Sequence, residues 1–194
     1  MPQLDRRALF SLEQYSEKRD SFRAEVLAAK KSRAVQLGDH VVLLFENRLT
    51  IQYQVQEMLR IEKIFEAAGI EEELEAYNPL IPDGDNWKAT MMIQYDDVEE
   101  RRRRLVDLVD IENQLWVQVG GGSKVVAIAD EDLDRADEHK TSAVHFLRFQ
   151  LDDDSVARVK AGEPIVFGTS HPEYPVGEFQ VSADTRKSLA TDLD

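Results

Sequence analysis

Apolar and polar residues repeat along this chain with two different periods, and the period predicts the type of each element. Apolar residues recur at helical spacing in residues 11–33 and, over a longer stretch, in residues 47–68. Gly69 follows the longer stretch and is placed to end that helix as its C′ residue. Shorter helices are expected at residues 70–77, 96–109, 152–161 and 182–193.

The remaining apolar segments have the pattern of strands. Residues 40–45 contain a continuous apolar run, which is typical of a strand that is buried on both faces and central in a sheet. Residues 115–119 and 124–129 flank a glycine-rich tip and predict a hairpin. Further strands are expected at residues 87–95, 142–151, 164–168 and 177–181.

The order of these elements predicts the fold class. Helices gather early and strands late, and a charged, mobile connector is expected at residues 130–140. Such an order favours an α+β fold with a mixed or mainly antiparallel sheet packed by helices. No repeat or low-complexity linker divides the chain, so we expect a single domain over residues 1–194.

Composition and charge narrow the classes of function. The 194 residues include 38 acidic and 24 basic side chains and no cysteine, giving a net charge of −14. Without cysteine there is no thiolate nucleophile, disulfide or cysteine-ligated cluster, and the negative charge opposes binding to nucleic acid. The chain has neither a long apolar run nor a signal-peptide pattern, so we expect a cytoplasmic protein with no membrane or nucleic-acid partner.

The helix expected at residues 47–68 carries an unusual polar residue. On a helical wheel Glu62 falls on the core-facing stripe, together with four apolar residues: Ile51, Val55, Met58 and Phe65. A buried carboxylate requires a partner, and the candidates are Asn47, Arg48 and Arg148. Glu62 is therefore either a functional ionisable group or half of a structural ion pair.

A second carboxylate on the same helix has a different expected role. Glu57 lies about 140° from Glu62 around the helix axis, so the two do not form a catalytic pair on one helix face. Arg60 follows Glu57 by three residues, and we expect these two side chains to pair.

Two histidines are further candidates. Strand alternation places His145 on an apolar face, where it is either a hydrogen-bonded core residue or a ligand or acid–base group. The segment at residues 170–175 contains two prolines and is expected to be a stiff loop that displays His171 and Tyr174. Such a loop suits either a site or an ordinary connection.

Several motifs give the chain a resemblance that covers nearly its whole length. They are FENR at residues 45–48, QVQEMLRIE at 54–62, YNPLIP at 77–82, TSAVHFLRF at 141–149 and HPEY at 171–174. With them the chain resembles an uncharacterised bacterial family that is catalogued only as a domain of unknown function. The resemblance implies genes that lie near rubrerythrin-like and iron–sulfur proteins, and therefore a redox or peroxide-defence setting.

Two hypotheses of function remain open, and the residues identify no cofactor. The first is a cytoplasmic binding or accessory protein, whose segment at residues 46–62 anchors a polar network lining a surface for a ligand, a protein partner or a second copy. The alternative is a metal-dependent enzyme with Glu62, His145 and His171 as metal ligands. The candidate ligand or network residues are Glu46, Asn47, Arg48, Glu57, Arg60, Glu62, His145, Arg148, His171 and Tyr174.

Overall fold

The computed structural model describes residues 2–132, 135–136 and 139–194. Within them the chain forms six α-helices and nine strands, and every strand pairing is antiparallel. This confirms the predicted α+β class, although the strands form two sheets and not one.

The two sheets are built from neighbouring and distant segments. Sheet A has the strand order β1 (Ala34–Leu37), β2 (Val41–Phe45), β3 (Asn86–Ile93), β7 (Val144–Gln150) and β6 (Ile128–Ala129). Sheet B has the order β5 (Lys124–Val126), β4 (Leu115–Val119), β8 (Ile165–Thr169) and β9 (Phe179–Gln180). As expected, β2 is flanked by a strand on each side.

The hairpin predicted at residues 115–119 and 124–129 is correct only in its first part. β4 pairs with β5, but β5 ends at Val126 and residues 128–129 pair with β7 in the other sheet. The chain therefore crosses between the sheets at Ala127, whose N–H donates to Leu115 O at 2.9 Å. The connector expected at residues 130–140 is described only in part, because residues 133–134 and 137–138 lie outside the described residues.

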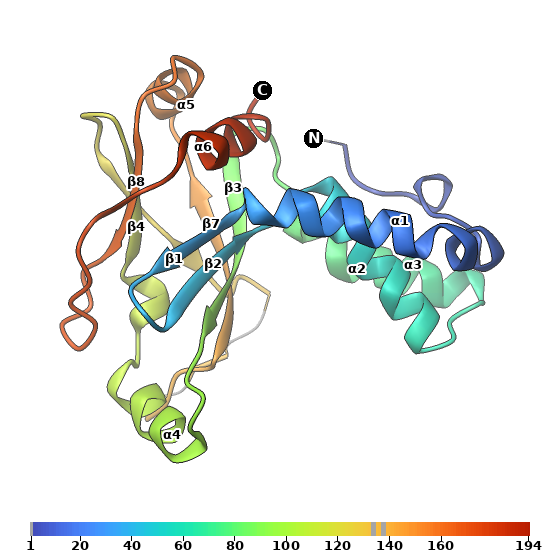
Figure 1. Ribbon diagram of the computed structural model, residues 1–194, viewed down its shortest axis with the longest axis horizontal. Coiled ribbons are helices and arrows are strands. Elements are labelled where there is room, and N and C mark those ends of the chain that lie inside the picture. Colours follow the sequence, from blue (N-terminus) through green and yellow to red (C-terminus); the bar gives the residue numbers. More distant parts are fainter. Residues whose placement is uncertain (1, 133–134, 137–138) are drawn as a thin grey trace.

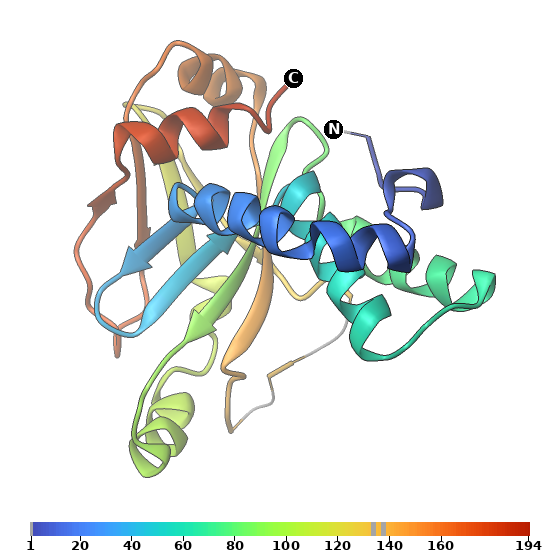
Figure 2. The same cartoon turned by 45° about the vertical axis from the view of Figure 1, so that its right-hand side comes forward.

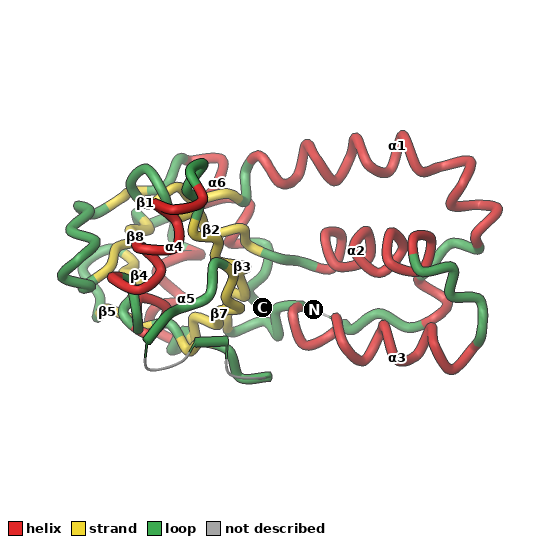
Figure 3. The backbone as a smooth tube through the Cα atoms, turned by 90° about the horizontal axis from the view of Figure 1, so that it is seen from below, coloured by secondary structure: helices red, strands yellow, loops and turns green. Residues whose placement is uncertain are grey.

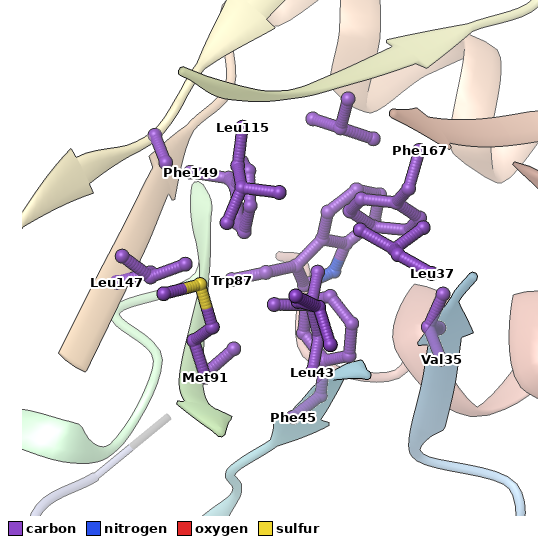
Figure 4. Packing of buried hydrophobic residues seen from close by; sticks show 14 of the residues in the cluster. Val35, Leu37, Leu43, Phe45, Trp87, Met91, Leu115, Leu147, Phe149 and Phe167 are labelled. Carbon is purple, nitrogen blue, oxygen red and sulfur yellow. The ribbon is translucent and has the colours of Figure 1, made fainter. Parts of the chain in front are cut away.

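The main core lies where the inner faces of the two sheets meet. Figure 4 shows Trp87, Phe149 and Leu147 of sheet A packing toward Leu115 and Phe167 of sheet B. Burial alternates strictly along β7, so the residues between the core positions face outward from sheet A. This outer face is the one that the helices of the N-terminal half approach.

Three helices extend from one side of the sheets and form what we call the helical arm (Figures 1 and 3). They are α1 (Leu12–Lys31), α2 (Arg48–Ile61) and α3 (Ala67–Tyr77), and 3-10 turns at Arg6–Ala8 and Asn78–Leu80 adjoin them. The arm has apolar clusters of its own, in which Ile51, Val55 and Leu59 of α2 face Leu74 of α3.

The remaining helices lie at the ends of the sheets. They are α4 (Val98–Asp107), α5 (Asp153–Lys160) and α6 (Ala183–Ala190), with a further 3-10 turn at Ile111–Asn113. Figure 2 shows α6 close to the junction of α1 with β1. In the described part of the chain, no helix combines the length and the apolar character that crossing a membrane requires.

The single long helix predicted at residues 47–68 is wrong. α2 ends at Ile61, Lys63 adopts a left-handed backbone with φ of 55°, and Gly69 lies inside α3 and not at a helix end. The break allows α3 to fold back onto α2, which buries Leu59 against Leu74. A continuous helix would leave both residues without a partner, so burial of apolar surface favours the turn.

Candidate functional site

The helical arm and the outer face of sheet A enclose a groove. It consists of two hollows of about 540 and 280 Å³ that share three lining residues: Tyr77, Leu80 and Phe146. The first continues toward Lys88 and Arg148, and the second toward Glu46 and Thr50. We call the two hollows together the arm–sheet groove.

The sheet side of the groove is made of two adjacent cross-strand rows. In the first row, Leu44, Thr90 and Phe146 of β2, β3 and β7 are direct partners. In the next row Lys88 pairs with Arg148, and Glu46 N–H extends the ladder by donating to Lys88 O at 2.8 Å. Because side chains alternate along a strand, all these residues point away from the core.

The arm side of the wider hollow is apolar and held in place by a polar anchor. Tyr77, Pro79 and Leu80 line it from the end of α3 and the 3-10 turn that follows. Between them, the Asn78 amide accepts from Leu4 N–H at 2.8 Å and donates to Leu4 O at 2.9 Å. This double hydrogen bond fixes the turn against the N-terminal segment.

Two ion pairs line the wider part of the groove. Lys88 Nζ lies 2.8 Å from Asp83 Oδ2, and the Arg148 guanidinium makes two hydrogen bonds of 2.8 and 2.7 Å to the carboxylate of Glu131. The hydrogen bonds from Arg148 hold the pKa of Glu131 below its ordinary value. Arg148 therefore does not pair with Glu62, as the sequence had led us to consider.

The narrower part of the groove contains a carboxylate that accepts hydrogen bonds from two hydroxyl groups. Glu46 accepts hydrogen bonds from Thr50 Oγ1 at 2.6 Å and from Thr90 Oγ1 at 2.9 Å. The next residue, Asn47, caps α2 by accepting from Thr50 N–H at 3.0 Å. Glu46 thus borders the groove at the start of α2, whereas Asn47 has a structural role.

The helix carboxylate that is held by basic partners is Glu57, not Glu62. Glu57 accepts two hydrogen bonds from Arg19 at 2.7 and 2.8 Å, one from Tyr15 Oη at 2.6 Å and one from Arg60 at 3.3 Å. The hydrogen bonds from Arg19 lower the pKa of Glu57 to about 2, against the opposing effect of burial. The expected pairing of Glu57 with Arg60 is confirmed, and the network joins α1 to α2.

Glu62 lies outside any core, contrary to the expectation from the helical wheel. It is the exposed C-cap residue of α2, and Phe65, placed on the same stripe, is 64% exposed. The break after Ile61 removes both residues from the predicted stripe. Arg48, also considered as a partner for Glu62, lies at the opposite end of α2 and has a buried Nε without a hydrogen-bond partner in the described residues.

His145 is buried in the core face of sheet A, and both ring nitrogens face acceptors. Nδ1 lies 2.5 Å from Asp130 Oδ2, while Nε2 lies 2.8 Å from Thr141 Oγ1 and 3.1 Å from Ser142 O. Thr141 in turn donates to Glu112 at 2.9 Å. This buried polar cluster ties β7 to the segment that follows β6, and His145 points away from the arm–sheet groove.

His171 and Tyr174 make hydrogen bonds to two separate backbone segments, at Val109 and at the turn between β1 and β2. His171 Nε2 donates to Val109 O at 2.9 Å, and its Nδ1 accepts from Glu173 N–H at 3.3 Å. The Tyr174 hydroxyl donates to Leu37 O at 2.7 Å. Both side chains are buried and fasten the loop to the body of the molecule.

The three residues considered as metal ligands do not converge. Glu62 is on the arm, His145 is in the sheet core and His171 is bonded to the backbone after α4. In the part of the chain that the structure describes, no group of three or more histidine and carboxylate side chains is arranged to hold a metal ion.

Sequence patterns therefore identified part of the groove and missed the rest. Of the ten candidates, Glu46 and Arg148 line it. Lys88, Tyr77 and Phe146 were not singled out, although strand alternation places Lys88 on a solvent-facing position and YNPLIP was among the motifs. That these segments meet is a property of the tertiary fold.

Comparisons with known proteins identify a family and a solved structure that are similar to this chain, both of unknown function. The profile of the family described as Protein of unknown function (DUF3501) matches residues 3–193. A protein of unknown function from Burkholderia pseudomallei, known from a crystal structure, is 50% identical in sequence. The two structures superpose over 100% of each chain with a TM-score of 0.94. No curated protein matches the chain.

Proposed function

The chain belongs to the family described as Protein of unknown function (DUF3501), and we propose that it acts as a cytoplasmic binding or accessory protein whose ligand occupies the arm–sheet groove. The observation that carries this proposal is the groove itself, with about 540 Å³ in its wider part. Ligand sites are concave and mostly apolar, with a few convergent polar groups, and this groove has that construction.

The groove is built from elements that hold it open. Its floor is formed by paired strands of sheet A, and its other wall is fixed by Asn78 against Leu4. A site that exists before its ligand binds loses little conformational entropy on binding. The groove also collects residues from four of the motifs that define the resemblance, FENR, QVQEMLRIE, YNPLIP and TSAVHFLRF.

An accessory role also fits the redox or peroxide-defence setting that the resemblance implies. A chain without cysteine holds no cysteine-ligated cluster, so in such a setting it would assist a redox protein and would not itself carry electrons through such a cluster. His145 is buried on the far face of sheet A from the groove.

Native mass spectrometry of the untagged protein, purified from its own host, tests the proposal. We expect a small molecule to be retained, and Phe146→Ala to lose it, because the ring forms the shared part of the groove. Phe179→Ala, at an exposed phenylalanine of β9, is the matched control and keeps the ligand. Retention by both variants, or no retained molecule in the natural chain, would count against the groove as the binding site.

A further inference from the structure

Resting on the proposed function, we infer that the arm–sheet groove selects a small organic anion, a carboxylate or phosphate attached to an apolar body. The charged group lies between Lys88 and Arg148, and the body packs against Tyr77, Leu80 and Phe146. Three features of the groove carry this inference: the position of the two cations, the exposure of their partners and the apolar wall beside them.

Lys88 and Arg148 are direct cross-strand partners in the middle of sheet A. Like charges directly opposite each other destabilise a sheet, so this pair requires negative charge close to both side chains. Lys88 is 11% exposed and Arg148 24% exposed, and both are carried by paired strands. The two cations are therefore held in place and shielded from water, which strengthens their attraction for an anion.

The carboxylates that now neutralise these cations are the exposed members of each pair. Asp83 is 58% exposed and Glu131 51% exposed, and each comes from a loop beside the groove. Because each carboxylate is itself about half exposed, water can solvate it when the charged group of a ligand takes its place. This exchange costs more for Glu131 than for Asp83, because two hydrogen bonds join Glu131 to Arg148. Asp83 and Glu131 thus occupy the place that the charged group of a ligand would take.

The wall next to the cations is apolar and partly aromatic. Leu80 and Pro79 face it from the arm, and Phe146 lies on β7 two residues before Arg148. An anion without an apolar body would leave this surface exposed to water. Contact with both parts of the groove therefore favours an organic anion over an inorganic one.

Four small probes separate the contribution of the anion from that of the apolar body. Three of them each lack or change one feature of the first. Phenyl phosphate carries both the anion and the ring, inorganic phosphate only the anion, phenol only the ring, and benzylamine a ring with a positive charge. We expect phenyl phosphate to bind about tenfold more tightly than any of the other three in NMR titrations, with shifts at Lys88, Phe146 and Arg148.

Variants of the two ion pairs give effects of opposite sign. Arg148→Gln should weaken phenyl phosphate binding by about tenfold. Glu131→Gln should strengthen it about two- to fivefold, because a competing carboxylate is removed. A gain in affinity does not result from misfolding. Arg102→Gln and Glu99→Gln, the two halves of an exposed ion pair on α4, are matched controls and leave the affinity unchanged.

The outcomes separate this inference from the proposed function. If phenol or benzylamine shifts the groove residues as strongly as phenyl phosphate does, the groove binds ligands but the anion class is wrong. Equal affinities for Glu131→Gln and the natural chain would also overturn the anion class. If none of the four probes shifts groove residues at millimolar concentration while the native host molecule is retained through Phe146, the inference fails and the proposed function stands.

Discussion

The Tyr174 hydroxyl joins three backbone groups of one turn. It donates to Leu37 O and accepts from the N–H groups of His40 and Val41 at 3.0 and 3.1 Å. Gly38, in the same turn, has φ of 63° and lies so close to Tyr174 that a Cβ there would be 2.9 Å from the hydroxyl oxygen. Tyr174 therefore fixes the turn between β1 and β2.

Removing this one oxygen tests that role. We expect Tyr174→Phe to lower the free energy of unfolding by about 2–3 kcal/mol, because buried backbone groups lose their partner. Urea denaturation measures the change. Tyr53→Phe is the control, since the Tyr53 hydroxyl makes no hydrogen bond with any described residue, and its cost should be small. Equal costs for the two variants would show that the hydroxyl does not hold the turn.

At this scale the sequence identified the residues but not their roles. The prolines at 172 and 175 predicted a stiff loop carrying His171 and Tyr174, yet whether the side chains face solvent or the body depends on the partner segment. For Tyr174 that segment is the turn at residues 37–41, more than a hundred positions earlier in the chain, and for His171 it is the backbone at Val109. Local patterns carry no information about such contacts.

Helix α1 is joined to α2 by the network around Glu57. The carboxylate has a pKa of about 2 in the folded protein, against an ordinary value of 4.5, because Arg19 hydrogen-bonds to it. A folded pKa below the unfolded one adds stability above about pH 4.5, and this contribution is lost as the pH falls toward 2. The packing of α1 on α2 should therefore become less stable in mild acid.

Glu57→Gln should abolish this part of the pH dependence. We expect a loss of about 1–2 kcal/mol at neutral pH, shrinking as the pH falls below about 4.5. Thermal unfolding followed by circular dichroism between neutral pH and pH 3 measures it. Glu62→Gln is the matched control on the same helix, and its exposed side chain should leave stability unchanged. If Glu62→Gln proves the more damaging change, our placement of these two carboxylates is incorrect.

Most elements were predicted correctly because their signals are local. α4, α5 and α6 begin within two residues of the expected starts, at the caps Asp97, Asp152 and Ser182, and alternation identified β3 and β7. The failure at residues 62–66 has a different cause. Apolar residues continue at helical spacing through the break, and what ends α2 is the packing of α3 against it.

Across the whole molecule, a buried ion pair joins the segment between α1 and β1 to the C-terminal end of the chain. Arg33 pairs with Asp192, and both side chains are almost fully buried. The Arg33 guanidinium also donates to Phe45 O at 3.0 Å, to Ser188 O at 3.2 Å and to Glu46 O at 2.9 Å. Arg33 thereby positions α6 against sheet A beside the groove residue Glu46.

Arg33→Met should be among the most destabilising single changes. It leaves Asp192 as an unpaired buried charge and removes the donor from three carbonyl groups, so we expect a loss of about 3–5 kcal/mol. Asp192→Asn keeps a side chain that can accept from Arg33 and should cost less. Guanidinium unfolding compares the two, and a loss below about 1 kcal/mol for Arg33→Met would refute this role.

The arm–sheet groove is a feature of the whole molecule, because separate helices, strands and loops form it. In its wider part the cations come from β3 and β7, the apolar wall from the end of α3, and the competing carboxylates from two loops. Glu46 and Arg148 were candidate residues because they are polar residues of the motifs. Lys88 was not a candidate, because its position beside Arg148 follows only from the register in which β3 and β7 pair. Local sequence patterns therefore predicted the fold class better than the site.

A crystal structure of the protein with phenyl phosphate tests the ligand-binding groove most directly. We expect the phosphate within hydrogen-bond distance of Lys88 Nζ and the Arg148 guanidinium, with Asp83 and Glu131 turned toward solvent and the ring against Phe146. An empty groove with both ion pairs intact at saturating phenyl phosphate, or the molecule bound only at another surface, would contradict the proposal.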